Sequence, residues 1–244
     1  FQGGNLTEEY ALLFYMLAFY AFWHFLRQPR KTWLLALIGV AAGLSFMLRA
    51  NLISPFVAIG IVLILEGIQQ RQFKATVKYL ALVLAGFSAV SVGFILYFAA
   101  HGALFDFFNA AFFYNFLYTQ KSALPLVRKI SFVVEIFPMY MLLLAGCFAI
   151  LCYVMQQKDG SASRLEKRFF TVFAIGYALE MLVYNLSGNN YFHYMVPLVP
   201  YEIFCFTLFT ALVLQARLKR SMVWQILSGS SVYAIALIFA FGFL

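Results

Sequence analysis

Residues 79–100 read YLALVLAGFSAVSVGFILYFAA and contain no charged side chain. An α-helix needs about 20 mainly apolar residues to cross the hydrocarbon core of a bilayer. The stretch meets that length, and it lacks the apolar/polar alternation that is typical of a strand in an outer-membrane barrel. It therefore predicts a transmembrane helix, and it decides the fold class from which the rest of the chain is interpreted.

The composition of the whole chain agrees with this interpretation. Of the 244 residues, 64% are hydrophobic, 20% are aromatic and only 11% are charged, whereas about a quarter of a soluble domain is charged. We therefore predict an all-α, polytopic transmembrane helical bundle with about eight spans. The predicted spans are residues 9–27, 33–48, 51–68, 77–100, 131–155, 169–187, 194–216 and 223–244.

The basic residues show which way the spans run. The net charge is +8, and the Lys and Arg residues gather in short connections between apolar segments. The positive-inside rule places these connections in the cytoplasm and the N-terminal end of the chain outside. Topology accounts for the positive charge, so we expect no nucleic-acid partner. The clusters are residues 27–31, 71–78, 158–168 and 217–220, and the exceptions are Arg49, Lys121, Arg128 and Lys129.

Residues 101–130 interrupt the pattern of spans. The segment reads HGALFDFFNAAFFYNFLYTQKSALPLVRKI, which is rich in aromatic residues but too polar for a span. Aromatic side chains favour the headgroup level of a bilayer. We therefore predict an outer interfacial helix or a re-entrant segment.

Polar residues collect at the outer ends of the predicted spans. Each has a structural alternative: carboxylates in a first turn favour the helix dipole, and residues 5–8 resemble a capping box. An arginine at a span end can snorkel to lipid headgroups. A glycine patch such as Gly39–Gly43 most simply allows close helix contact. The outer set comprises Glu8, Glu9, Arg49, Asn51, His101, Asp106, Asn189, Asn190, Tyr191, His193 and Tyr194.

Three carboxylates, Glu135, Glu180 and Glu202, fall inside predicted spans. Such groups are costly in lipid and usually face the bundle interior or a polar cavity. Glu180 and Glu202 lie near the outer ends of their spans. They could line the floor of an outward-facing cavity or pair with Tyr or Asn on neighbouring helices.

Three motifs in order, GGNLTEEYALLF, GLSFMLRANL and NYFHYMVPLVP, are similar to the later part of GT-C membrane glycosyltransferases. The resemblance is to the bacterial branch related to protein O-mannosyltransferases and aminoarabinose transferases, and it covers most of the chain. It implies a multi-pass enzyme of the bacterial cytoplasmic membrane. Such an enzyme transfers a sugar from a polyprenyl-phosphate donor on the extracytoplasmic face, and the sugar and acceptor stay open.

The resemblance also implies roles for individual residues. Glu8 or Glu9 would lie near the donor phosphate, with a divalent metal ion such as Mg or Mn. Arg49 would contact the lipid phosphate. The sugar or phosphate contacts would be Asn190, His193 and Tyr194, and the cavity candidates are Asp106, Glu180 and Glu202.

The chain departs from the family pattern in one respect. The family's principal catalytic carboxylate lies in the first outer loop, upstream of the acidic motif seen here, so we expect it before Phe1. Residues 1–244 would then form a single transmembrane domain that lacks the N-terminal helices and the first outer loop, and would be inactive alone.

Two other functions remain open. A transporter or flippase of lipid-linked or small solutes would explain the carboxylates within spans, although no internal repeat is visible. An O-antigen polymerase or ligase would use the same donor on the same side of the membrane, with a large outer loop rich in arginine.

Overall fold

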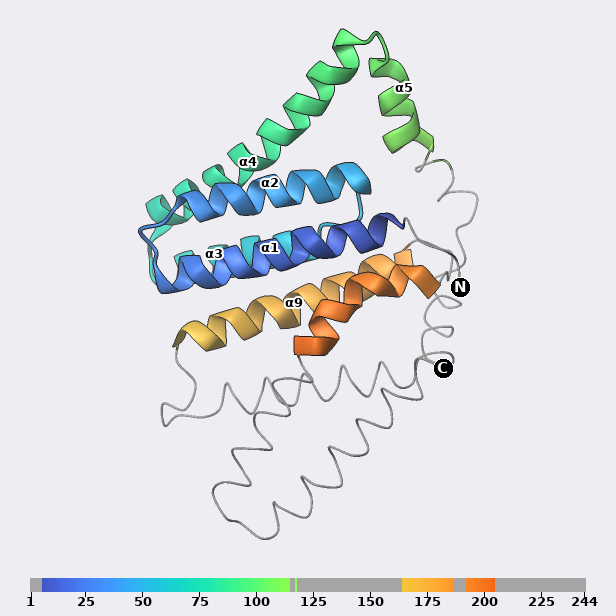
Figure 1. Ribbon diagram of the computed structural model, residues 1–244. Coiled ribbons are helices and arrows are strands. Elements are labelled where there is room, and N and C mark those ends of the chain that lie inside the picture. Colours follow the sequence, from blue (N-terminus) through green and yellow to red (C-terminus); the bar gives the residue numbers. More distant parts are fainter. Residues whose placement is uncertain (1–5, 115–116, 118–163, 187–191, 205–244) are drawn as a thin grey trace.

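The computed structural model describes residues 6–114, 117, 164–186 and 192–204 (Figure 1). Every regular element in these ranges is a helix, which confirms the all-α prediction for them. The predicted spans 131–155 and 223–244, most of 194–216, and the residues Glu135 and Asn190 lie outside the described residues. The elements are α1 (Thr7–Arg27), α2 (Trp33–Leu48), α3 (Ser54–Gln69), α4 (Phe73–Ala100), α5 (Leu104–Phe108), the π-helical η1 (Asn109–Phe113), α9 (Arg164–Leu186) and the 3₁₀ helix η2 (Phe192–Leu198).

Several helix ends differ from the predicted spans. Helix α3 begins at Ser54 rather than at residue 51, because residues 50–53 form a turn and Pro55 fits the first turn of a helix. Helix α4 begins at Phe73, before its apolar run. Its first turns contain Lys74 and Lys78, which are polar, so hydropathy does not mark them as part of a span although their backbone is helical. The span predicted from residue 194 instead opens in the 3₁₀ helix η2, which contains Pro197.

Two of the described helices, α1 and α4, are long and apolar enough to cross a membrane. Helix α4 has 28 residues, about 42 Å at 1.5 Å per residue, and Gly86 is its one buried residue. Large apolar side chains such as Leu84 and Leu96 are more than 60% exposed on it, which suits contact with lipid. Helices α2 and α3 have 16 residues each, about 24 Å, which is shorter than the ~30 Å hydrocarbon core.

Helices α2 and α4 cross in close contact. A Cβ atom at Gly39 would collide with the backbone of Val83, and one at Gly86 would collide with the backbone of Ala36. Small residues at such a crossing let two backbones approach, as in membrane helix pairs. The glycine patch predicted from the sequence is therefore a helix contact.

Aromatic rings join α1 to α9 and to the segment after η2. Phe19 stacks on Phe173 with ring centroids 4.2 Å apart, and Phe173 stacks on Phe204 at 3.9 Å. Tyr201 meets both Phe19 and Phe173 edge-on. These rings bury apolar area and fix the relative position of the three segments.

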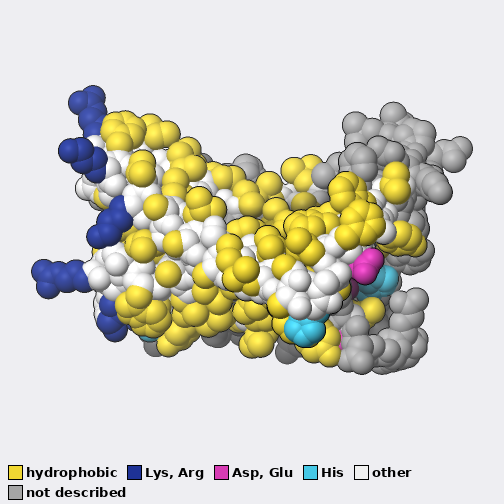
Figure 2. Space-filling view, turned by 90° about the horizontal axis from the view of Figure 1, so that it is seen from above, with side chains coloured by type: hydrophobic (Ala, Val, Ile, Leu, Met, Phe, Trp, Pro, Cys, Tyr) yellow, Lys and Arg dark blue, Asp and Glu magenta, His cyan; other side chains and the backbone are white. Residues whose placement is uncertain are grey.

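The two ends of the bundle differ in charge. The turns that join α1 to α2 and α3 to α4 lie at one end, and Figure 2 shows the Lys and Arg side chains of the visible face gathered at one end of the molecule. Exposed cations in and beside these turns are Arg27, Arg30, Lys31, Arg71, Lys74 and Lys78. Their position agrees with the predicted cytoplasmic connections. We call this the basic end, and we call the opposite one, where α1 begins and α2 ends, the outer end.

The first part of the 101–130 segment is helical and turns back from α4 (Figure 1). The turn uses Gly102 with φ 67°, a left-handed conformation that costs glycine little. Phe98 of α4 stacks on Phe107 of α5 with centroids 4.6 Å apart. Asp106 of α5 is exposed. An interfacial position for this segment stays a prediction.

Candidate functional site

Glu8 and Glu9 lie in the first turn of α1 but face different surroundings. Successive residues of an α-helix point about 100° apart, so only one of two neighbours can face the bundle. Glu8 is 2% exposed, whereas Glu9 is exposed. The Thr7 hydroxyl donates a hydrogen bond to Oε2 of Glu8 at 3.0 Å. The structure thus places Glu8, and not Glu9, in the interior.

Arg49 follows the last turn of α2 and reaches α1. Its Nη1 donates to Oε1 of Glu8, which forms an ion pair. Its guanidinium carbon also lies 4.2 Å from the ring centroid of Tyr194 in η2, within cation–π range. The Arg49 side chain is 27% exposed and that of Glu8 is 3% exposed. One cation therefore joins three chain segments at the outer end.

The structure gives the Glu8 carboxylate partners other than those that the capping interpretation predicts. The residue before α1 is Leu6, and its side chain makes no capping hydrogen bond. Glu8 instead uses its carboxylate on Thr7 and Arg49. Its position in the first turn still favours the helix dipole. Arg49 is likewise more than a snorkelling residue, because its guanidinium has two partners within the protein.

A small cavity opens beside the ion pair. Its water-accessible volume is about 10 Å³, which is about the space of a single water molecule. Asn51 is one of its lining residues, and its Oδ1 is buried and accepts no hydrogen bond from the described residues. The hydroxyl of Tyr15 donates to Oε2 of Glu180 at 3.1 Å, at a buried position. The cavity is lined by Glu8, Arg49, Asn51, Leu52, Glu180, Val183, Tyr194 and Pro197.

The other predicted site residues lie apart from this cavity. Asp106 is exposed on α5, which contacts α4 and η1. Glu202 is buried, and no described residue donates a hydrogen bond to its Oε1. His193 packs edge-on against the ring of Tyr194 at 4.5 Å and is not among the lining residues. Glu180 is thus the one cavity candidate that the structure brings to Glu8 and Arg49.

Tyr15 was not among the predicted site residues. It lies inside an apolar run, where a tyrosine normally signals core. Its spacing from Glu8 could have indicated it: Tyr15 lies seven residues after Glu8, and residues i and i+7 share one face of a helix. Tyr15 is fully buried, and its hydroxyl reaches Glu180.

The divalent metal ion that the resemblance implied stays a prediction. The described residues contain no group of three or more His, Cys, Asp or Glu side chains near enough to share a metal ion. The position beside Oε1 of Glu8 is taken by the Arg49 guanidinium. The cation that faces Glu8 in this structure is therefore an arginine, and no step below uses a metal.

A comparison of the chain with protein-family models, with curated proteins and with solved structures found no match. What this site can do must therefore be argued from its chemistry. Arg49 offers a planar set of N–H donors suited to a phosphate or carboxylate. Tyr194 offers an aromatic face, and Asn51 offers an acceptor that no described residue engages.

Proposed function

We propose that this chain is part of a GT-C membrane glycosyltransferase, with a bundle of about eight spans in the bacterial cytoplasmic membrane. In this proposal it transfers a sugar from a polyprenyl-phosphate donor on the extracytoplasmic face. One observation carries the proposal: Glu8, Arg49 and Tyr194 belong to three separate motifs, and they surround a single cavity at the outer end. If each motif served only its own local structure, the three would have no reason to meet at one cavity.

Arg49 is the proposed contact to the donor phosphate. A guanidinium has five N–H donors, and Glu8 engages Nη1 alone. The other donors can bind phosphate oxygens as the sugar leaves and negative charge develops there. Glu8 holds the guanidinium in place, and the Tyr194 ring supports its flat face.

The cavity itself suits a single hydroxyl of the sugar, because its volume is about that of one water molecule. Asn51 presents a buried acceptor without a partner among the described residues, and Glu180 is held by Tyr15. A hydroxyl could donate to either oxygen. The base that takes the proton of the acceptor is not assigned to Glu180.

Binding of polyprenyl phosphate to the purified chain tests the proposal. Arg49→Ala should weaken binding about 10- to 100-fold, because a hydrogen bond to a charged group contributes roughly 1.5–3 kcal/mol. Arg49→Lys should recover only part of the affinity, since an ammonium lacks the planar fork. Sugar transfer is then measured in membranes that contain the whole gene product.

Glu9→Gln is the matched control for Glu8→Gln, because the two residues are adjacent and differ in burial. We expect Glu8→Gln to reduce binding and transfer and Glu9→Gln to leave both unchanged. Equal effects of the two variants, or full affinity in Arg49→Ala, would contradict the site assignment. Transport of a lipid-linked solute without any sugar transfer would favour the flippase alternative.

A further inference from the structure

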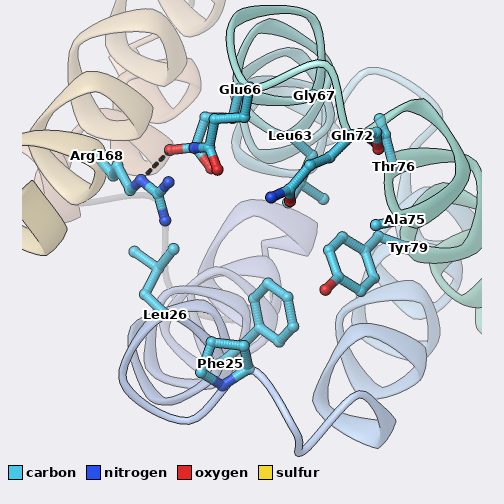
Figure 3. A pocket seen from close by; sticks show the side chains of 12 residues that line it. Phe25, Leu26, Leu63, Glu66, Gly67, Gln72, Ala75, Thr76, Tyr79 and Arg168 are labelled. Atoms are coloured by element: carbon cyan, nitrogen blue, oxygen red, sulfur yellow. Dashed lines mark hydrogen bonds and ion pairs between the residues drawn. The ribbon is translucent and has the colours of Figure 1, made fainter.

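A larger cavity lies at the basic end, away from every predicted site residue. Its volume is about 170 Å³, and it is bordered by α1, α3, α4 and α9 (Figure 3). Cavities of about 150 Å³ can hold a small ring such as benzene, whereas pockets for drug-sized ligands measure about 300–1,000 Å³. The cavity therefore fits a small chemical group and not a whole large ligand.

The walls of the cavity are of two kinds. Figure 3 shows Glu66 paired with Arg168 on one side and Tyr79 on the other. The side chains in this ion pair are 18% and 22% exposed, so water reaches them. Phe25 and Leu63 supply apolar surface. The polar walls can therefore hold the polar group of an amphipathic ligand, while the apolar tail of the same ligand lies along the outside of the helices.

The cavity lies at the basic end of the bundle, and exposed cations stand next in sequence to several of its lining residues. Pro29, Gln70 and Gln72 line it, and they adjoin the exposed cations Arg30 and Arg71. Each Lys or Arg near an anionic membrane surface contributes about 1 kcal/mol of attraction. The positive charge of this end thus favours a ligand that carries a negative charge.

Arg71 occupies a backbone position that normally belongs to glycine. Its φ is 55°, in the left-handed region that is unfavourable for residues with a Cβ atom. It ends α3 in a Schellman motif: Gln72 N–H donates to the Gly67 carbonyl at 2.8 Å, and Arg71 N–H donates to the Ile68 carbonyl at 3.2 Å. Glycine is the usual residue at this point. A cation held at a backbone cost, between two lining glutamines, indicates a use for its charge.

We propose that this cavity binds the headgroup of an anionic phospholipid from the cytoplasmic leaflet. In this proposal the phosphodiester lies outside Gln70 and Gln72, near Arg71. Hydroxyl groups of the head reach Glu66 and Gln72, and the acyl chains lie outside the cavity along the apolar helices. Basic cavities between membrane helices on the cytoplasmic side bind anionic headgroups in this way. The inference needs a membrane-embedded chain but does not rest on glycosyl transfer.

Native mass spectrometry of the purified chain tests the proposal, with phosphatidylglycerol and phosphatidylcholine supplied in equal amounts. We expect selective retention of phosphatidylglycerol. Arg71→Gly should reduce the affinity about fivefold, while the melting temperature stays the same or rises because glycine relieves the backbone. Ala75→Phe, which places a ring in the cavity, should abolish selective retention.

Lys31→Gly is the matched control, because Lys31 is an exposed cation at the same end and, unlike Arg71, is not next in sequence to a residue that lines the cavity. It should retain nearly the wild-type affinity. Equal losses in Lys31→Gly and Arg71→Gly would show general attraction to a basic surface and would overturn the proposal. Equal retention of the two lipids would do the same. Displacement of the lipid by millimolar glycerol phosphate would identify a soluble phosphate ester as the ligand instead.

Discussion

The hydroxyl of Tyr15 donates a hydrogen bond to Oε2 of Glu180, a residue 165 positions further along the chain. Tyr15 is fully buried and Glu180 is 3% exposed. The bond therefore joins α1 to α9 in the interior, beside the cavity at the outer end. It gives a carboxylate within a predicted span the partner that such a group needs.

Tyr15→Phe should destabilise the protein by about 1–3 kcal/mol, because it removes a donor from a buried carboxylate. Thermal unfolding in detergent measures the change. Glu180→Gln should make the loss of the tyrosine hydroxyl less costly, and a double-mutant cycle gives this coupling. An unchanged melting temperature in Tyr15→Phe would mean that the hydrogen bond contributes nothing.

Glu8→Gln should also destabilise the protein, and Glu9→Gln should not. The first change leaves the Arg49 guanidinium without its charged partner. Because Arg49 is partly exposed, we expect a cost of about 1–2 kcal/mol and not the 3–5 kcal/mol of a fully buried pair. Glu9→Gln at an exposed position should stay within about 0.5 kcal/mol. The melting temperatures of the two variants provide the comparison.

Gly86→Ala should disrupt the crossing of α2 and α4. The added Cβ atom would meet the Ala36 backbone, and overpacking of this kind costs about 1–3 kcal/mol. Gly93→Ala on the same helix is the control, since an added Cβ there would meet no other part of the described chain within 4 Å, apart from its neighbours and its own helix backbone. Replacement of this second glycine should be neutral or mildly stabilising. A similar melting temperature for both variants would contradict a close crossing.

Cysteine labelling in intact cells tests the orientation. Cys147, Cys152 and Cys205 are first replaced by Ala, and then Glu9→Cys and Lys31→Cys are introduced separately. Both positions are exposed and lie at opposite ends of α1. A membrane-impermeant maleimide should label the first variant directly and the second only after permeabilisation. The reverse pattern would put the basic end outside, contrary to the positive-inside rule.

The sequence predicted the helices well where apolar runs and helix ends coincide. The predicted span 33–48 has the bounds of α2. Helices α4 and α9 extend beyond their predicted spans, because their first turns are polar and basic. A hydropathy pattern reports the apolar part of a helix, whereas backbone hydrogen bonds determine its length.

The site was only partly predictable. Sequence motifs indicated Glu8, Arg49 and Tyr194, but the choice between Glu8 and Glu9 depends on how α1 is rotated against its neighbours. The pairing of Glu66 with Arg168 joins α3 to α9. No local pattern contains that information, because it comes from the way distant helices pack.

The contact between α2 and α4 also determines which parts of the bundle can move. Their backbones come close together at Gly39 and Gly86, so no side chain separates them at these two positions, and little room is left for one helix to move toward the other. Helices α1 and α9 meet through stacked rings instead, and packed helices of this kind can slide in a shear motion. Arg49 follows α2, and Tyr194 lies in η2. Such sliding would change the distance between the cation and the ring, so this contact would respond to a shift of one part of the bundle against the other.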